Sequence, residues 1–280
     1  MAVCPDFNKL STHPLLPNPR MASLTLAIDS SSTVLSVAIV ENANSVFELD
    51  SIQFQDPSKP HNARSNAGDD DSLPLGYVRK RSKGKGKTSR IFPLGASTLL
   101  APMLKAALDQ YGTTLQKIDL IAVTKGPGSF TSLRVGVVTA KTIAYAMDIP
   151  ILGINTLEAL AFGAAELSSP SKASDLPITL KIRPVINAQR RQLFSSYYQA
   201  HLDAPSMFDL DEISSSQVTD FETWKSSISS GDLITGPGVP SEFTAELATQ
   251  LDCKLLSVQE RNCSASLVGR LARKKHIAGE

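Results

Sequence analysis

The sequence predicts a mixed α/β protein built from two sheet-containing parts. Three observations lead to this prediction: a hairpin pattern opens at residue 24, strand and helix patterns alternate over 94–167, and further strand patterns follow from 179. Paired strands followed by strands that alternate with helices are typical of mixed sheets with flanking helices. At 280 residues, 42% of them hydrophobic, the chain is long and apolar enough to bury a core in each part.

The first part opens with strands rather than with a strand and a helix. Apolar residues alternate over 24–28 and form a run over 34–40, and the polar segment between them predicts a β-hairpin. This is not a Rossmann opening, in which a helix directly follows the first strand. A third strand is expected within 47–54. Beyond residue 92 we expect a helix over 94–111 that ends at Gly112, a buried strand over 118–123, a helix over 133–147, a strand over 151–154 and a helix over 156–167.

The second part has weaker patterns. The expected elements are strands over 179–185 and 193–198, a helix over 221–228, a short strand over 233–234 and a terminal helix over 264–278. Subdomains of 21–160 and 161–280 follow from this order, with residues 1–20 as a disordered N-terminal extension. Met21 is a second candidate for the start of translation.

The formal net charge of +1 hides an uneven distribution. Residues 56–90 carry a net charge of +5, and the other 245 residues carry −4. Because 56–90 has no hydrophobic periodicity, we expect it to be a disordered basic insertion in the first subdomain. Within it, 79–90 holds seven Lys or Arg and no acid. Two interpretations stay open: a salt-dependent contact with RNA, or a solubilising loop.

Composition also limits compartment and chemistry. Three scattered cysteines form no disulfide framework, no stretch reaches the roughly 20 apolar residues of a membrane helix, and 1–20 lacks the apolar core of a secretory signal. We therefore expect a cytoplasmic protein. The four histidines have neither HxxxH nor HExxH spacing, so we expect no metal site, and no nucleophile has a convincing base beside it, so we predict no catalytic residue.

Two loops follow buried strands and could face a nucleotide or phosphate. In the first, an acid closes the strand and small hydroxyl residues follow it; a polar turn is the alternative. The second joins a strand to a helix through two glycines, and either an anion site at the helix N-terminus or a structural turn fits it. The candidate residues are Asp29, Ser30, Ser31, Gly126, Gly128 and Ser129. Gly86-Lys87-Thr88 is not a phosphate loop, because Arg81 stands where the first glycine is needed.

Several of these runs closely resemble the bacterial TsaB (YeaZ) family, a Gcp-like family of the ASKHA superfamily. The most specific is Gly126-Pro127-Gly128-Ser129-Phe130-Thr131-Ser132-Leu133-Arg134-Val135-Gly136, and the runs at 26–31, 99–103 and 154–161 extend the resemblance. It is strong over 24–54 and 92–162. In the second part, Asn187 and Gln189 replace an Asp and an Arg of the family pattern, which weakens any claim to nucleotide or hydrolytic chemistry.

The resemblance implies an actin-like ATPase (ribonuclease H-like, ASKHA) fold with two subdomains of mixed sheet and flanking helices. It also implies a non-catalytic dimerisation or scaffold subunit in tRNA processing, in the complex that makes N6-threonylcarbamoyladenosine at tRNA position 37 (t6A37). The implied partners are a TsaD-like transferase subunit, a TsaE-like ATPase and, through the complex, tRNA, with 79–90 as a candidate tRNA contact. The chain itself would require no cofactor, ATP or ADP could sit at the partner interface, and a homodimer could form when the chain is alone.

Related proteins join TsaD through two N-terminal helices, which correspond here to about 96–110 and 131–147. The candidate interface residues are Leu100, Met103, Leu104, Ala107, Arg134, Gly136, Val137, Ala140 and Ala144. The competing hypothesis is an active ATPase or small-molecule kinase of the same fold, with Asp29 near metal and phosphate.

Overall fold

The computed structural model describes most of the chain from residue 23 onward. The described residues are 23–51 without 33 and 44, 77–81, 89–93, 95–170, 177–204, 207–239 and, within 240–280, 243, 244, 247, 253–257, 260 and 262–280. The expectations for 1–20, for 56–76 and for 82–88 lie outside these residues.

The first half contains a five-stranded mixed sheet. Its order is β3-β2-β1-β6-β7, with antiparallel pairing among β1 to β3 and parallel pairing from β1 through β6 to β7. The strands are β1 (Leu24–Asp29), β2 (Ser36–Glu41), β3 (Ser45–Asp50), β6 (Leu120–Gly126) and β7 (Ile151–Asn155). The hairpin and the alternating strands and helices predicted from the sequence are confirmed.

The second half repeats this strand order. Its sheet runs β10-β9-β8-β11-β12, again with three antiparallel strands followed by parallel ones. The strands are β8 (Ile178–Gln189), β9 (Gln192–Ala204), β10 (Met207–Asp220), β11 (Leu233–Thr235) and β12 (Lys254–Leu255). Strands β10 and β12 were not predicted from the sequence, because β10 is largely exposed with polar residues on both faces and β12 spans two residues.

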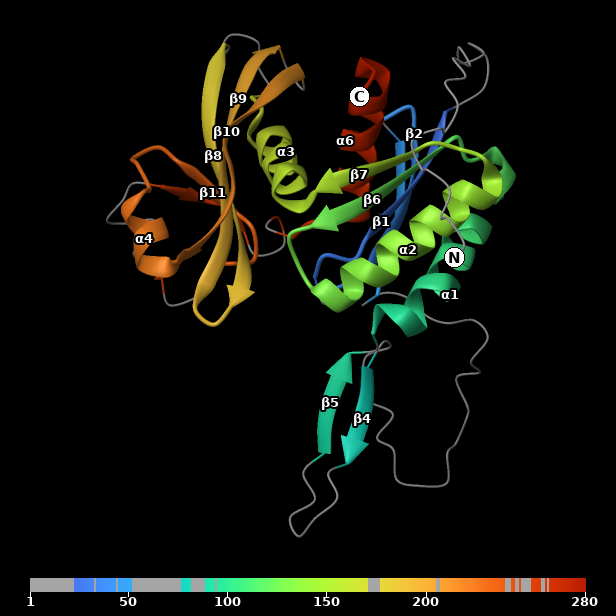
Figure 1. Ribbon diagram of the computed structural model, residues 1–280. Helices are drawn as coiled ribbons and strands as arrows, with labels where there is room; N and C mark the ends of the chain where they lie inside the picture. Colours follow the sequence, from blue (N-terminus) through green and yellow to red (C-terminus); the bar gives the residue numbers. More distant parts are fainter. Residues whose placement is uncertain are drawn as a thin grey trace, which may run out of the picture.

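Helices α1 (Ala96–Tyr111) and α2 (Phe130–Met147) cover one face of the first sheet (Figure 1). The apolar stripe of α1 and the small residues of α2 pack on Leu26, Ile28 and Ile121. Because side chains alternate along a strand, the residues between these, such as Ala27 and Ala122, face the opposite side of the sheet. A short 3₁₀ helix, Leu115–Lys117, leads into β6, and α4 (Phe221–Ser226) follows β10.

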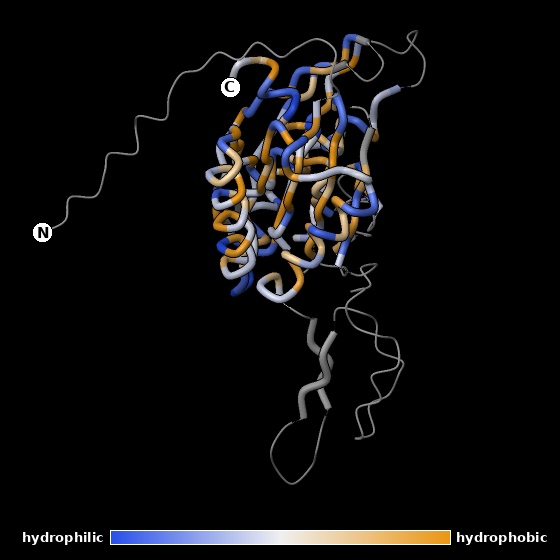
Figure 2. Tube along the Cα trace, turned by 90° about the vertical axis from the view of Figure 1, so that its right-hand side faces the viewer, coloured by the Kyte–Doolittle hydropathy of each residue, from blue (hydrophilic) through white to orange (hydrophobic). Residues whose placement is uncertain are grey.

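Two further helices cross between the halves. Helix α3 (Thr156–Ser168), from the end of the first half, packs on β8 to β11, and α6 (Ala265–Ala278), from the end of the chain, packs on β1, β2, β6 and β7. They also contact each other between the two sheets (Figure 1). One hydrophobic cluster therefore contains residues of both sheets, and Figure 2 shows the hydrophobic stretches recurring through the body of the molecule.

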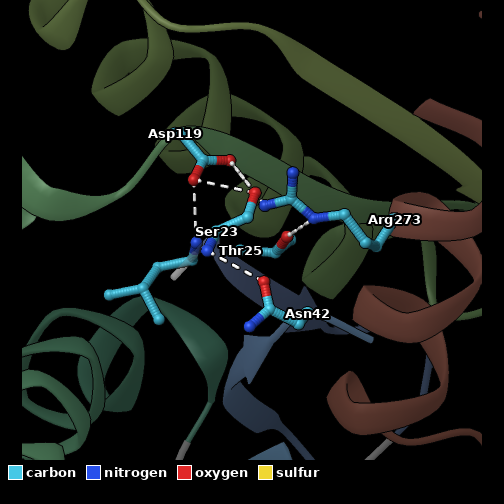
Figure 3. A network of polar contacts seen from close by, with 6 residues as sticks. Ser23, Thr25, Asn42, Asp119 and Arg273 are labelled. Atoms are coloured by element: carbon cyan, nitrogen blue, oxygen red, sulfur yellow. Dashed lines mark hydrogen bonds and ion pairs between the residues drawn. The ribbon is translucent and has the colours of Figure 1, made fainter. Parts of the chain in front are cut away.

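A polar network fixes α6 on the first sheet (Figure 3). Arg273 of α6 is 4% exposed; its Nε donates a hydrogen bond to Thr25 Oγ1 at 3.0 Å, and its guanidinium lies 2.5 Å from Asp119 Oδ1. Asp119 also accepts hydrogen bonds from Ser23 Oγ and from the backbone N–H of Leu24. Charge-assisted bonds of this kind fix the orientation of the helix.

Part of the basic insertion is regular, which the sequence analysis did not expect. Strands β4 (Tyr77–Arg81) and β5 (Ser89–Pro93) pair antiparallel as a separate two-stranded sheet. Each has too few alternating apolar residues to give a periodic signal. Among the described residues, no helix is long and apolar enough to span a membrane.

Candidate functional site

The two loops predicted to face a phosphate meet at one edge of the first sheet. Asp29 ends β1 and Gly126 ends β6, and since these strands are parallel neighbours, the loops that follow them leave from the same edge. The backbone N–H of Ser30 donates to Thr124 Oγ1 at 3.2 Å, and that of Ser31 donates to Asp29 Oδ1 at 3.0 Å. The structure thus brings the six candidate residues together.

The meeting point is closed rather than hollow. The backbone N–H of Ser129, at the start of α2, donates to the carbonyl of Ser31 at 2.7 Å. A Cβ at Gly128 would lie 2.2 Å from that same carbonyl oxygen, and one at Gly136 would lie 2.2 Å from Ser30 Oγ. These glycines therefore serve close contact between loop and helix. Asp29 and Ser30 are 0% exposed and Ser31 is 5% exposed, so the turn presents little surface to a ligand.

Asp29 is nonetheless electrostatically unusual. Burial raises its pKa above the usual value, and hydrogen bonds from Ser31, Thr124 and Cys263 offset only part of that effect. Among the described residues, none provides a hydrogen-bond partner for its Oδ2 atom. Burial also raises the pKa of Glu48, whose carboxylate accepts a hydrogen bond from the backbone N–H of Ser266. The site therefore favours a protonated carboxyl.

Across the described residues, no group of three or more His, Cys, Asp or Glu side chains is arranged to hold a metal ion. The glycines of the loop Gly236-Pro237-Gly238 pack on β8: a Cβ at Gly236 would lie 2.1 Å from the carbonyl oxygen of Val185. The space beside β8 is filled by backbone.

Most of the candidate interface residues lie inside the protein. The buried ones pack on the chain's own first sheet or its loops, and they are Leu100, Met103, Leu104, Ala107, Gly136, Ala140 and Ala144. Arg134 is exposed and Val137 is half-buried. Helical periodicity identifies an apolar or small-residue face but not what covers it, and here the chain's own sheet covers it.

A different face of α2 is exposed and apolar. Phe130, Val138 and Tyr145 are 71%, 62% and 87% exposed, and their spacing of eight and seven residues places them on one side of the helix. The guanidinium of Arg134 lies 4.8 Å from the ring centroid of Phe130, between the same turns. This stripe was not predicted from the sequence, although Phe130, Val138 and Tyr145 interrupt an otherwise small or polar surface. Exposed apolar stripes of this kind mark interaction surfaces.

A second feature that could not be predicted from the sequence is the backbone conformation of the turn between β8 and β9. Gln189, Arg190 and Arg191 all have positive φ angles, of 69°, 51° and 63°. Asn187 Oδ1 accepts a hydrogen bond from the backbone N–H of Gln189 at 2.7 Å. Hairpins with positive φ at both central residues ordinarily carry Asn-Gly or Asp-Gly there. The only signal in the sequence was two arginines where a turn residue is expected.

Comparisons with known proteins find similarity to TsaD and TsaB proteins. A family model described as "TsaD: tRNA N6-adenosine threonylcarbamoyltransferase" matches residues 96–201. The tRNA threonylcarbamoyladenosine biosynthesis protein TsaB of Bacillus subtilis is 34% identical over 98 residues, 35% of this chain and 38% of that protein. The Haemophilus influenzae TsaB is 28% identical over 162 residues, 56% of this chain and 65% of that protein. The chain thus matches less than two thirds of the length of these relatives.

The fold is similar to that of a solved structure. YeaZ from Pseudomonas aeruginosa superposes with a TM-score of 0.58 at 17% identity, covering 92% of this chain and 93% of that one. With the repeated strand order of the two halves, this confirms the predicted actin-like fold.

Proposed function

We propose, from the premise that this chain belongs to the TsaB/YeaZ family of Gcp-like proteins, that it is a non-catalytic dimerisation or scaffold subunit of the t6A37 modification complex. It pairs with a TsaD-like transferase subunit, a TsaE-like ATPase docks on the pair, and tRNA is engaged through the complex in the cytoplasm. ATP or ADP, where it is used, sits at the partner interface.

The observation that carries the proposal is the exposed stripe of Phe130, Val138 and Tyr145 on α2. These side chains lie outside this chain's own core. Their apolar surface is therefore removed from water, with a gain in free energy, only when another protein covers it. The stripe lies on one of the two helices through which related proteins join TsaD. Aromatic residues and arginine are the types enriched at the centre of protein interfaces, and Arg134 lies between them.

A non-catalytic role agrees with the closed loops around Asp29. An ATPase or kinase of this fold needs space for phosphates beside the first strand, and here the amide of Ser129 and the Cα of Gly128 occupy that space. If the competing hypothesis holds instead, the isolated protein binds ATP tightly and loses turnover in the Asp29→Ala variant.

The first test mixes the full chain with its TsaD-like partner and measures the mass of the complex by size exclusion with light scattering. We expect a heterodimer. Val138→Asp should weaken the heterodimer at least tenfold, because the carboxylate would be desolvated in an apolar interface. Val218→Asp is the matched control: this valine is 53% exposed on β10 of the second sheet, and its replacement should leave the heterodimer intact.

The second test removes the gene and measures t6A in cellular tRNA by mass spectrometry. We expect the modification to be lost and to return when the wild-type chain is restored, but only weakly with Val138→Asp. Absence of a heterodimer together with unchanged t6A in the deletion strain would refute the proposal.

A further inference from the structure

The exposed apolar stripe on α2 also contains two positive charges. With about 100° of rotation per residue, five side chains fall within an arc of about 80° around the helix axis, and two cations alternate there with three apolar groups. The five are Phe130, Arg134, Val138, Lys141 and Tyr145. Both cations are exposed, and the helix contains no Asp or Glu. The outer face of α2 is therefore apolar and purely cationic.

Neither charge is neutralised by the described part of this chain. No ion pair between described residues includes Arg134 or Lys141. The nearest acid that follows in sequence, Asp148, is the C-cap of the helix. Helix α1 beside it differs, because its exposed Lys105 pairs with Asp109 at 2.5 Å. The two charges of α2 are thus available to whatever covers the stripe.

A second copy of this chain is a poor partner for the stripe. An antiparallel pair of α2 helices that sets Phe130 opposite Tyr145 of the second copy would match the apolar residues, since the two lie at opposite ends of the stripe. The same register sets Arg134 opposite Lys141, and two-fold symmetry repeats this contact. Four cations and no acid of α2 would then share one interface, and like charges placed opposite each other oppose association.

We infer that Arg134 and Lys141 determine which protein binds α2: they select an apolar surface that carries carboxylates opposite them, and they reject a second copy of this chain. The inference rests on the proposed function, in which the occupant is the TsaD-like subunit. A carboxylate opposite each cation gives a charge-assisted hydrogen bond while the apolar side chains are covered. Specificity arises when the wrong partner is repelled as well as the right one attracted.

The variant Arg134→Glu tests both parts of the inference. In the antiparallel register its carboxylate would face Lys141 of the second copy, so the isolated chain should self-associate at least tenfold more tightly than the wild type at about 50 mM KCl. The heterodimer with the TsaD-like subunit should weaken at least tenfold, because the new carboxylate would face an acid. Analytical ultracentrifugation of the full chain, alone and mixed with the TsaD-like subunit, measures both dissociation constants.

Two further variants and one change of condition serve as controls. Arg134→Glu combined with Lys141→Glu places four acids in the self-pair, so it should not self-associate and should still bind the TsaD-like subunit weakly. Lys181→Glu makes the same change of charge at an exposed position on β8 of the second sheet and should leave both dissociation constants within about twofold of wild type. Raising KCl to about 500 mM should strengthen wild-type self-association and weaken the heterodimer, because salt screens repulsion and attraction alike.

The inference and the proposed function can fail separately. If the wild-type heterodimer forms and Val138→Asp disrupts it, but Arg134→Glu changes neither assembly, the cations do not select the partner; the inference is then wrong and the proposed function stands. Failure of the wild type to pair with the TsaD-like subunit counts against the proposed function. If Arg134→Glu loses binding to phosphatidylserine vesicles but keeps its affinity for the TsaD-like subunit, the cations serve a membrane surface and the inference is overturned.

Discussion

Arg273 places a buried charge between α6 and the first sheet, and its two partners differ in exposure. Arg273 is 4% exposed, whereas the Asp119 side chain is 45% exposed. Arg273→Met removes the buried cation and leaves Asp119 able to contact water, so we expect a loss of about 1–2 kcal/mol in the free energy of unfolding. Asp119→Ala leaves the guanidinium buried without its counter-ion and removes the acceptor for Ser23 and Leu24, at a cost of about 3–5 kcal/mol.

Urea unfolding monitored by tryptophan fluorescence measures both losses. Lys105→Ala serves as the control, because its ion pair with Asp109 is exposed and should contribute less than about 0.5 kcal/mol. A larger loss for Arg273→Met than for Asp119→Ala would contradict the prediction.

The raised pKa of the buried Asp29 carboxyl predicts how the stability of the protein depends on pH. Its folded-state pKa lies above the ordinary value of 3.8, so in the interval above pH 3.8 the folded protein retains a proton that the unfolded chain has released. Stability therefore falls as pH rises through that interval. Asp29→Asn should raise the urea midpoint at pH 8 and weaken the fall of that midpoint as the pH rises above 3.8, with Glu48 accounting for part of the fall that remains. Asp203→Asn, at an exposed position, should change neither; an Asp29→Asn midpoint below wild type at pH 8 would count against the prediction.

At the scale of elements, α6 and α3 each contain a glycine that packs closely against a neighbour. The neighbour of Gly269 is the sheet, which is rigid, and the neighbour of Gly163 is a flexible side chain. A Cβ at Gly269 of α6 would lie 2.6 Å from Val40 Cγ2 and 2.9 Å from Ala27 Cβ, both on the sheet. A Cβ at Gly163 of α3 would lie 2.8 Å from the end of the Leu267 side chain, which can rotate away. Gly269→Ala should therefore lower the free energy of unfolding by about 1–3 kcal/mol. In Gly163→Ala, the gain in helix propensity, about 1 kcal/mol, should offset most of the strain. Urea unfolding of the two variants measures this difference. Equal losses in the free energy of unfolding would show that the sheet moves to accommodate the added methyl group as easily as the leucine does.

Which sheet each helix covers could not be predicted from the sequence, although the helices themselves could. The patterns over 133–147 and 264–278 correspond to α2 and α6, within three residues at each end. Periodicity is a local property, however, and the partner of α6 lies more than 200 residues earlier, at β1 and β2. The same limit explains the candidate site. The sequence placed Asp29 and Gly128 on loops, but their mutual contact, which closes the site, depends on the parallel pairing of β1 with β6.

At the scale of the whole molecule, α6 makes the two halves depend on each other. It covers the face of the first sheet that α1 and α2 leave open, including Ala27, Ala122 and Ile154. It also reaches the second half: Arg270 pairs with Glu166 of α3 at 2.7 Å, and Lys274 Nζ donates to the carbonyl of Phe208 on β10. Loss of the helix would expose apolar surface in one half and remove contacts from the other.

We therefore predict that the full chain unfolds in one cooperative transition and that a chain ending at Cys263 has none. Because one hydrophobic cluster includes residues of both sheets, neither half keeps a closed core without α6. Calorimetry of the two proteins measures this, and shortening the chain only after Ile277 provides the control, since that side chain is 76% exposed. Two separate transitions in the full chain, or a cooperative transition in the shortened one, would mean that each half is stabilised by its own helices. The interlocked core would then determine how the halves are arranged but not whether they fold.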